Sequence, residues 1–468
     1  MDQTSCERHA GVEGISVPRR IQHRFLIYLL GLASGAVAFA LPIATHAADS
    51  IDHSEAASIF QQADVICTRD GGKLWGQSLC GPMLLVDPND RSVVANQADA
   101  DGVLKASDGV FVGVLPADQP LSDTTITWSG TRWCELLWPW PMREDDDMRH
   151  VTLAHELFHR IQLDDLHIEK RDGDNAHLDT LDGRYFIELE WRALTAALQA
   201  STPESRRIAI ADAILFRAER YRLFPSAADN ELALESNEGI AEYTGVRLGL
   251  QTHEQRVAYA IRDLSFGAES ASFVRAFAYS TGPAYGLLLD QAAPNWLDNF
   301  VATQRTKRLD QRLSSALHLA APDFTRLAAR TAVYDPGGKL RVKEVAREED
   351  KRKKLIAFKA TLIDGPVIVL PILHSRMEFK PQSLVPIDDI GTVYPTLTLR
   401  DNWGTLIVED GGALLRKQPE QATVSATGFD RTTLRGQGFS LVLNPGWSIQ
   451  SGTRHGDLIV SETVKKVP

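Results

Sequence analysis

Hydrophobic and polar positions divide the chain into zones with different periods. Residues 48–145 contain short apolar runs separated by turn residues, a pattern that predicts strands. In residues 146–330 apolar positions recur every three or four residues, which predicts several helices. Residues 355–468 return to short runs between turn signals, so we expect a small all-β domain of sandwich or barrel type. The predicted fold class is therefore α+β.

Several segments carry the strand pattern clearly. In the first zone they are residues 83–86, 92–94, 110–115, 124–128 and 131–138. In the last zone they are residues 355–362, 367–373, 396–399, 405–408, 440–443 and 458–460. Between the helical and the last zone, residues 331–354 contain Pro336-Gly337-Gly338 and then a charged run, which indicates a linker or an exposed helix.

The N-terminal segment has the features of a secretory leader. Basic residues at 19–24 precede an apolar stretch at 25–42, and small residues follow up to Ala47. This order predicts a signal peptide over residues 1–47 that is cleaved after Ala47. An uncleaved membrane anchor is the alternative, and we expect membrane association only in that case. The predicted location is the bacterial periplasm or the medium.

Length, composition and charge narrow the class of protein. The chain has 468 residues, which favours two or three domains, and its 44% apolar content is enough to form cores. The formal net charge is −11, and no long Lys/Arg run is present. A nucleic-acid binder needs a basic face that replaces counterions, so we expect no nucleic-acid partner.

Three of the four cysteines lie after the leader. In an oxidising compartment Cys67 and Cys80 are expected to close a small hairpin-like loop around Asp70-Gly71-Gly72. Cys134 lies in a strand-like run and is expected to be a buried thiol. No pairing rule excludes Cys134 as a partner in the disulfide.

The chemistry is indicated by His155-Glu156-Leu157-Phe158-His159, which lies in an apolar-periodic helix after three aspartates. Two histidines four residues apart project from one face of a helix, so both imidazoles can reach one zinc ion. Glu156 lies between them and can act as a general base toward water at the metal. An amphipathic helix with two hydrogen-bonded histidines is the alternative.

A catalytic zinc site requires a third protein ligand. Asp165 follows His159 by six residues, where some zinc proteases place a His or Asp, but Gln162 stands where that arrangement needs a glycine. A stronger candidate is the segment from Glu231 to Glu242, in which four glutamates recur at spacings of four, three and four. That spacing places them on one helical face, either as a solvated acidic face or around a cation.

Within that segment, Asn237-Glu238-Gly239 and the His155–His159 motif together resemble the gluzincin metallopeptidases, the clan of thermolysin and the zinc aminopeptidases. The resemblance implies a zincin-like helical catalytic domain, one zinc ion per chain and Glu238 as the third ligand. It also implies that Glu242 orients the first histidine, as outer carboxylates do. We expect Gly239 to allow a close approach to the histidine helix. Glu235 is the runner-up ligand, and Glu190 is a further option.

The segment 277–286 resembles the Tyr-x-x-Gly sequence downstream of the third ligand in zinc aminopeptidases. This resemblance makes Tyr279 the donor to the oxyanion. Tyr285 is the alternative, and a purely structural aromatic residue in a helix core is another interpretation. Arg275 lies one turn earlier and is expected to form a structural ion pair, with a substrate carboxylate as the other possibility.

The predicted function is therefore that of an exported zinc metallopeptidase acting on a peptide or protein substrate. In that reaction Glu156 takes a proton from water and passes it to the leaving amine. Two alternatives remain open: a catalytically silent binding protein of the cell envelope on the same scaffold, and a zinc hydrolase of non-peptide amides. The C-terminal β domain carries no motif that assigns it a role.

Overall fold

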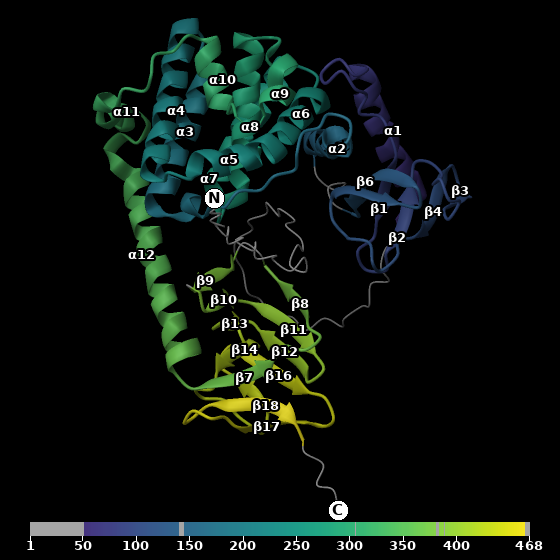
Figure 1. Ribbon diagram of the computed structural model, residues 1–468, viewed down its shortest axis with the longest axis vertical. Coiled ribbons are helices and arrows are strands. Elements are labelled where there is room, and N and C mark those ends of the chain that lie inside the picture. Colours follow the sequence, from purple (N-terminus) through teal and green to yellow (C-terminus); the bar gives the residue numbers. More distant parts are fainter. Residues whose placement is uncertain (1–50, 140–144, 305, 381–382, 388, 464–468) are drawn as a thin grey trace, which may run out of the picture.

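The computed structural model describes residues 51–463 except for 140–144, 305, 381–382 and 388. The predicted leader and its cleavage site at Ala47 lie outside the described residues. A strand zone, a helical region and a C-terminal strand-rich region follow one another along the chain (Figure 1), so the α+β class is confirmed at this level. None of the helices in the described part of the chain is long and apolar enough to cross a membrane.

The helices are α1 (His53–Asp70), α2 (Asp146–Gln162), α3 (Leu181–Gln199), α4 (Pro203–Leu223), α5 (Ala227–Leu234), α6 (Ile240–Gly249), α7 (His253–Glu269), α8 (Phe273–Ala292), α9 (Phe300–Thr303), α10 (Leu309–Ala316), α11 (Leu327–Tyr334) and α12 (Lys339–Lys359). The N-terminal strands are β1 (Met83–Val86), β2 (Ser92–Ala95), β3 (Lys105–Ser107), β4 (Val110–Val114), β5 (Thr124–Trp128) and β6 (Thr131–Leu137). The C-terminal strands are β7 (Val367–Pro371), β8 (Arg376–Phe379), β9 (Val385–Ile387), β10 (Gly391–Tyr394), β11 (Leu397–Asp401), β12 (Gly404–Val408), β13 (Ala413–Lys417), β14 (Glu420–Ser425), β15 (Arg435–Gly436), β16 (Phe439–Leu443), β17 (Trp447–Ser451) and β18 (Leu458–Glu462).

The N-terminal strands form one mixed sheet in the order β3-β4-β2-β1-β6-β5. β1 pairs with β2 antiparallel and with β6 parallel, and β5 lies at the edge beside β6. The histidine-bearing helix α2 packs against β5 and β6. The strands expected from the sequence in this zone are therefore present, and the edge of their sheet lies next to the helix that carries the candidate chemistry.

Helix α1 corrects the expectation that this zone consists of strands. Asp52 caps its N-terminus by accepting from the backbone N–H groups of Ser54 and Glu55. Ile59, Ala63 and Ile66 are buried at a helical spacing of four and three. That period is visible in the sequence, but the surrounding strand signals obscured it. α1 packs on α2, so it supports the candidate site from outside the sheet.

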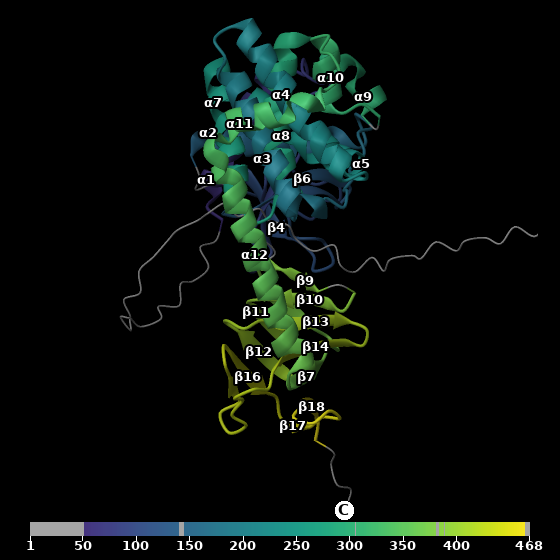
Figure 2. The same ribbon diagram turned by 90° about the vertical axis from the view of Figure 1, so that its left-hand side faces the viewer.

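The segment expected as a linker or an exposed helix takes the second form. Residues 331–354 include the end of α11 and most of α12, which continues to Lys359. Leu340 and Glu344 of α12 are buried, and both views show α12 extending from the helical region to the C-terminal strands (Figures 1 and 2). The strand expected at 355–362 is wrong, because α12 and a following π turn occupy it.

The C-terminal strands form two facing sheets, as expected of a sandwich. One has the order β17-β18-β7-β14-β13-β10-β9 and the other β15-β16-β12-β11-β8. Their inner faces share a core around Trp403, Leu399 and Leu406. The C-terminal region therefore has a core of its own.

Candidate metal centre

His155, Glu156 and His159 project from the buried C-terminal half of α2. Asp145 caps this helix by accepting from the Met148 N–H, as the run of aspartates before it predicted. The side chains of the two histidines and of Glu156 are all at least nine-tenths buried. The two imidazole Nε2 atoms lie 3.0 Å apart, so the histidines converge on one point as the spacing predicted.

Glu238 joins the two histidines from a neighbouring segment. Its Oε2 lies 3.4 Å from His159 Nε2 and 3.6 Å from His155 Nε2. A tetrahedral zinc ion with bonds of about 2.0–2.1 Å holds its ligand atoms about 3.3 Å apart. The three measured separations scatter around that value, so these residues fit a zinc ion. Together they form one of two groups in the described residues whose ligand atoms are close enough to hold a metal ion.

Hydrogen bonds orient both imidazoles with Nε2 toward the common point. His155 Nδ1 lies 2.7 Å from the Glu242 carboxylate, and His159 Nδ1 lies 2.6 Å from Gln162 Oε1. Both partners accept, so in the neutral imidazoles the proton belongs on Nδ1 and Nε2 presents a lone pair. Three acceptor atoms then converge, which is favourable only around a cation or a proton. Glu242 hydrogen-bonds the first histidine, as the resemblance implied.

The charges at the site shift the pKa values of its members in opposite directions. Burial lowers the pKa of His155, but the carboxylates of Glu238 and Glu242 outweigh this effect and hold it well above its usual value. Burial lowers the pKa of His159. Burial also opposes the charge of Glu238, yet the two imidazoles hold its pKa well below the usual range. Protons and a metal ion therefore compete for the same atoms.

Glu156 lies beside this group without being part of it. Its Oε1 is 3.9 Å from His155 Nε2, and its buried Oε2 has no hydrogen-bond partner among the described residues. Burial raises the pKa of Glu156 to about 8. A positive charge nearby would lower that pKa, because it favours the ionised form. A buried carboxylate beside the histidines, with one oxygen that has no hydrogen-bond partner, has the capacity to accept a proton that a general base needs.

A π turn divides the row of glutamates into two pairs. Residues Glu235–Gly239 form a π-helical turn between α5 and α6. The extra residue in this turn rotates the side chains of α6 about the helix axis relative to those of α5. The expectation of a single acidic face is therefore wrong: Glu231 and Glu235 face the arginines of α4, whereas Glu238 and Glu242 face the histidines of α2.

The other ligand candidates already have cationic partners. Glu235 binds Arg217 at 2.8 Å, and Glu190 binds both Arg217 and Arg220. Asp165 pairs with Arg132. Of the candidate acids weighed for the third ligand, Glu238 alone joins the histidines in the described part of the chain.

The expected role of Gly239 is wrong. A Cβ on Gly239 would meet Ala278 and Gly282 of α8, not the histidine helix. The close approach between α6 and α2 occurs at Gly245 instead, where a Cβ would lie 2.6 Å from the Val151 carbonyl oxygen. Gly239 and Gly282 bring α8 against the π turn, and so place Tyr279 beside Glu238.

Tyr279 lies in the site and Tyr285 does not. The Tyr279 hydroxyl donates to Glu238 Oε2 at 2.7 Å, and its ring stacks on His155. The Tyr285 hydroxyl donates to Glu190 in the buried ion network behind the site. To donate to an oxyanion, Tyr279 has to exchange Glu238 for substrate, so that role stays a prediction.

Arg275 contacts the other oxygen of Glu238. Its Nη2 lies 3.2 Å from Glu238 Oε1 and its Nη1 lies 3.0 Å from Asp172. The expected structural ion pair is therefore present, and one of its members is a candidate ligand. This contact holds the Glu238 carboxylate with Oε2 toward the histidines.

Two residues of the site were not expected from the sequence. Gln162 lies one turn after His159 and accepts from its Nδ1. Side chains three residues apart on a helix are neighbours, so the sequence spacing could have predicted this contact. Asp123 lies before the edge strand β5, near His155 and Glu156, and burial raises its pKa to about 7. No local motif marks Asp123, because only the sheet brings it to α2.

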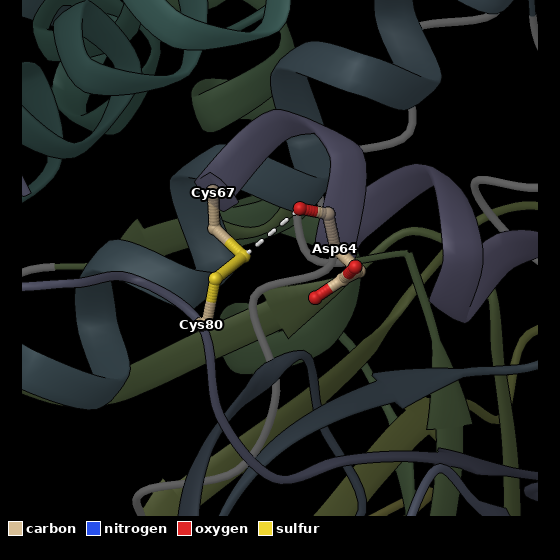
Figure 3. Close-up of side chains that lie close together, drawn as sticks. All are labelled: Asp64, Cys67 and Cys80. Carbon is tan, nitrogen blue, oxygen red and sulfur yellow. Dashed lines mark hydrogen bonds between the residues drawn. A yellow bond between two sulfur atoms is a disulfide. The ribbon is translucent and has the colours of Figure 1, made fainter. Parts of the chain in front are cut away.

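The second group close enough to hold a metal consists of Asp64, Cys67 and Cys80 (Figure 3). Cys67 and Cys80 form the expected disulfide, and Cys67 Sγ lies 3.3 Å from the Asp64 carbonyl oxygen. Sulfur atoms bonded to each other are not thiolate ligands. Cys134 is buried and free, so it is not a partner in the disulfide.

Comparisons with known proteins leave the family open. No protein-family model matches the chain, and neither a curated protein nor a solved structure matches it.

Proposed function

We propose that the protein is an exported zinc-dependent metallopeptidase with a gluzincin-type ligand set on a zincin-like helical domain. The observation that carries the proposal is the convergence of His155 Nε2, His159 Nε2 and Glu238 Oε2. Export is supported by the predicted leader and by the Cys67–Cys80 disulfide, a bond that persists in oxidising compartments.

The residues of the site have distinct roles in this proposal. His155, His159 and Glu238 would hold zinc, which when bound supplies Lewis-acid polarisation of the scissile carbonyl and a more acidic water. Glu156 accepts the proton from the attacking water and delivers it to the leaving amine. Glu242 keeps the His155 proton on Nδ1, and Tyr279 donates its hydroxyl to the developing oxyanion.

The test combines metal content with cleavage of a peptide library by the purified full chain. We expect about one zinc ion per chain and cleavage that Glu156→Gln lowers by roughly 10²–10⁴-fold while zinc stays bound. Asp165→Asn is the control, because Asp165 pairs with Arg132 outside the site, and it should cleave like the wild type.

Each failure has a separate meaning. Bound zinc without cleavage of peptides or of cell-wall amides would favour the silent binding protein. Bound zinc with cleavage of non-peptide amides alone would favour the second alternative. Cleavage by Glu156→Gln at the wild-type rate would refute the general base.

A further inference from the structure

Two of the proposed zinc ligands, which come from different helical segments, are joined by a chain of side-chain amides. His159 Nδ1 lies 2.6 Å from Gln162 Oε1. Gln162 Nε2 donates to Asn237 Oδ1 at 3.0 Å, and Asn237 Nδ2 donates to Glu238 Oε1 at 3.1 Å. All four side chains are buried. The chain therefore runs from a ligand on α2 to a ligand on the π turn.

We propose that Gln162 and Asn237 form an amide relay that holds His159 in the metal-binding tautomer and fixes the direction of the Glu238 carboxylate. Both are positioning residues, since they contact the ligands and not the reacting atoms. The proposal rests on the proposed zinc site, but not on the reaction carried out there.

The direction of the relay is fixed by its Glu238 end. A carboxylate only accepts, so Asn237 must turn its NH₂ group toward Glu238 and its oxygen toward Gln162. That oxygen also only accepts, so Gln162 must turn its NH₂ group toward Asn237 and its own oxygen toward His159. The oxygen of Gln162 in turn requires a proton on His159 Nδ1, which leaves Nε2 with its lone pair.

Burial makes this order costly to reverse. Gln162 is 0% exposed and Asn237 is 5% exposed, so water cannot readily replace a lost partner. Reversing either amide would set oxygen against oxygen or NH₂ against NH₂ inside the protein, which leaves buried polar groups unsatisfied. The two histidines are thus held by different means: a carboxylate, Glu242, orients His155, and the relay orients His159.

The first test measures the tautomer without any metal. In the full chain labelled with ¹⁵N-histidine and treated with chelator, the ring nitrogens of His159 report which of them carries the proton. We expect the Nδ1–H form in the wild type and a mixture of tautomers in Gln162→Met. In Gln162→Glu a proton should stay on Nδ1, because the carboxylate keeps an acceptor there. The signals are assigned by comparison with His159→Asn.

Gln304→Met is the matched control for loss of a buried amide. Gln304 is also buried, and its side chain hydrogen-bonds the backbone of His167 and Glu169, which follow α2 in the sequence. It should leave the His159 tautomer unchanged. An Nε2–H form of His159 in the wild type, or a mixture in Gln304→Met equal to that in Gln162→Met, would overturn the relay.

The second test measures zinc affinity in a double-mutant cycle. Gln162→Met and Asn237→Leu should each weaken zinc binding by about 10–100-fold, as is typical for groups that orient ligands. Because the two amides act in series, the double variant should have the same zinc affinity as whichever single variant binds zinc more weakly. Losses that add, or an affinity unchanged in both single variants, would refute the relay.

The two proposals can fail separately. If the wild type binds zinc but cleaves nothing, the peptidase proposal fails and both tests of the relay can still be carried out. If the wild type binds no zinc, the proposed metal site is refuted, and the tautomer measurement alone tests the relay. Cleavage together with additive losses of zinc affinity keeps the peptidase and removes the relay.

Discussion

At the scale of single residues, the glutamates of one short segment differ in what contacts them. The carboxylates of Glu231 and Glu235 lie against the guanidinium groups of Arg220 and Arg217 and are already neutralised. In Glu238, Oε1 pairs with Arg275, whereas Oε2 faces two imidazoles and accepts from the Tyr279 hydroxyl. A cation therefore gains most at Glu238 Oε2.

Removing Glu238 should abolish tight zinc binding. Glu238→Ala leaves two imidazoles, so little zinc should remain after dialysis against a weak chelator. Glu242→Ala should weaken binding by about 10–100-fold, because it frees the His155 tautomer without removing a ligand. The measurement is zinc per chain, with Asp165→Ala as the control that keeps its metal. If Glu238→Ala keeps its zinc and Asp165→Ala loses it, Asp165 and not Glu238 is the third ligand.

Removing Glu235 should destabilise the fold rather than relieve a repulsion. Arg217 is fully buried, and without Glu235 it keeps Glu190 as its main partner. Breaking a buried pair typically costs about 3–5 kcal/mol, and we expect about 3 kcal/mol here because Glu190 remains. Urea unfolding measures the change, and Glu349→Ala on exposed α12 is the control with little effect. If removal of Glu235 leaves the protein as stable as the wild type, its pairing with Arg217 contributes no net stability, as expected of a repulsive acidic face.

How far the sequence predicts the site depends on how local each signal is. Helical spacing predicts that His155 and His159 converge with Glu156 between them. The resemblance of Asn237-Glu238-Gly239 to a family motif is what singles out Glu238 and Glu242. The contacts of Asn237 with Gln162 and of Asp123 with the histidine helix do not follow, because they depend on how α2, the π turn and the sheet are placed together. Spacing alone suggested one acidic face, and one extra residue in a turn divided it.

At the scale of elements, the π turn Glu235–Gly239 and its neighbours place the site. It follows α5 without a break and continues into α6, so the same segment faces the arginines of α4 before the turn and the histidines of α2 after it. Gly245 allows α6 to approach α2, and Gly282 allows α8 to approach the turn. Helical period predicted that these helices exist, but not the extra residue, since neither composition nor spacing marks a π turn.

The contact between α3 and α12 should make stability depend on pH. Burial raises the pKa of Glu188 to about 7, while Lys343, 3.5 Å away, offsets part of this effect. An unfolded glutamate has a pKa of about 4.3. The folded state thus holds the proton more tightly, so this stabilisation is complete below about pH 4.3 and is lost as the pH rises through about 7.

Thermal unfolding from acid to neutral pH measures this dependence. Glu188→Gln cannot titrate, so its melting temperature should fall less than that of the wild type between these two pH values. Glu349→Gln, on the exposed part of α12, should follow the wild type. An equal slope in all three proteins would show that Glu188 does not titrate in this range.

At the scale of the whole molecule, the disulfide supports the part of the fold that carries the histidines. Cys80 lies next to Leu79, and the backbone oxygens of both accept from Arg160, the residue after His159. The bond from Cys80 to Cys67 thus connects α1 with the segment that holds the end of α2. A disulfide of this kind persists in oxidising compartments, which is the structural support for the proposed export.

The last prediction joins export with the state of the cysteines. If the predicted leader is cleaved, protein recovered from a periplasmic extract should begin at or near Ala48, whereas an intact Met1 end in the membrane fraction would show an anchor. In the folded protein no cysteine should react with a thiol reagent, since Cys67 and Cys80 are bonded and Cys134 is buried. In the cleaved chain, which lacks Cys6, one thiol should react after unfolding without reductant, and three after reduction. Two or more reactive thiols before reduction would remove the disulfide and, with it, the structural argument for export.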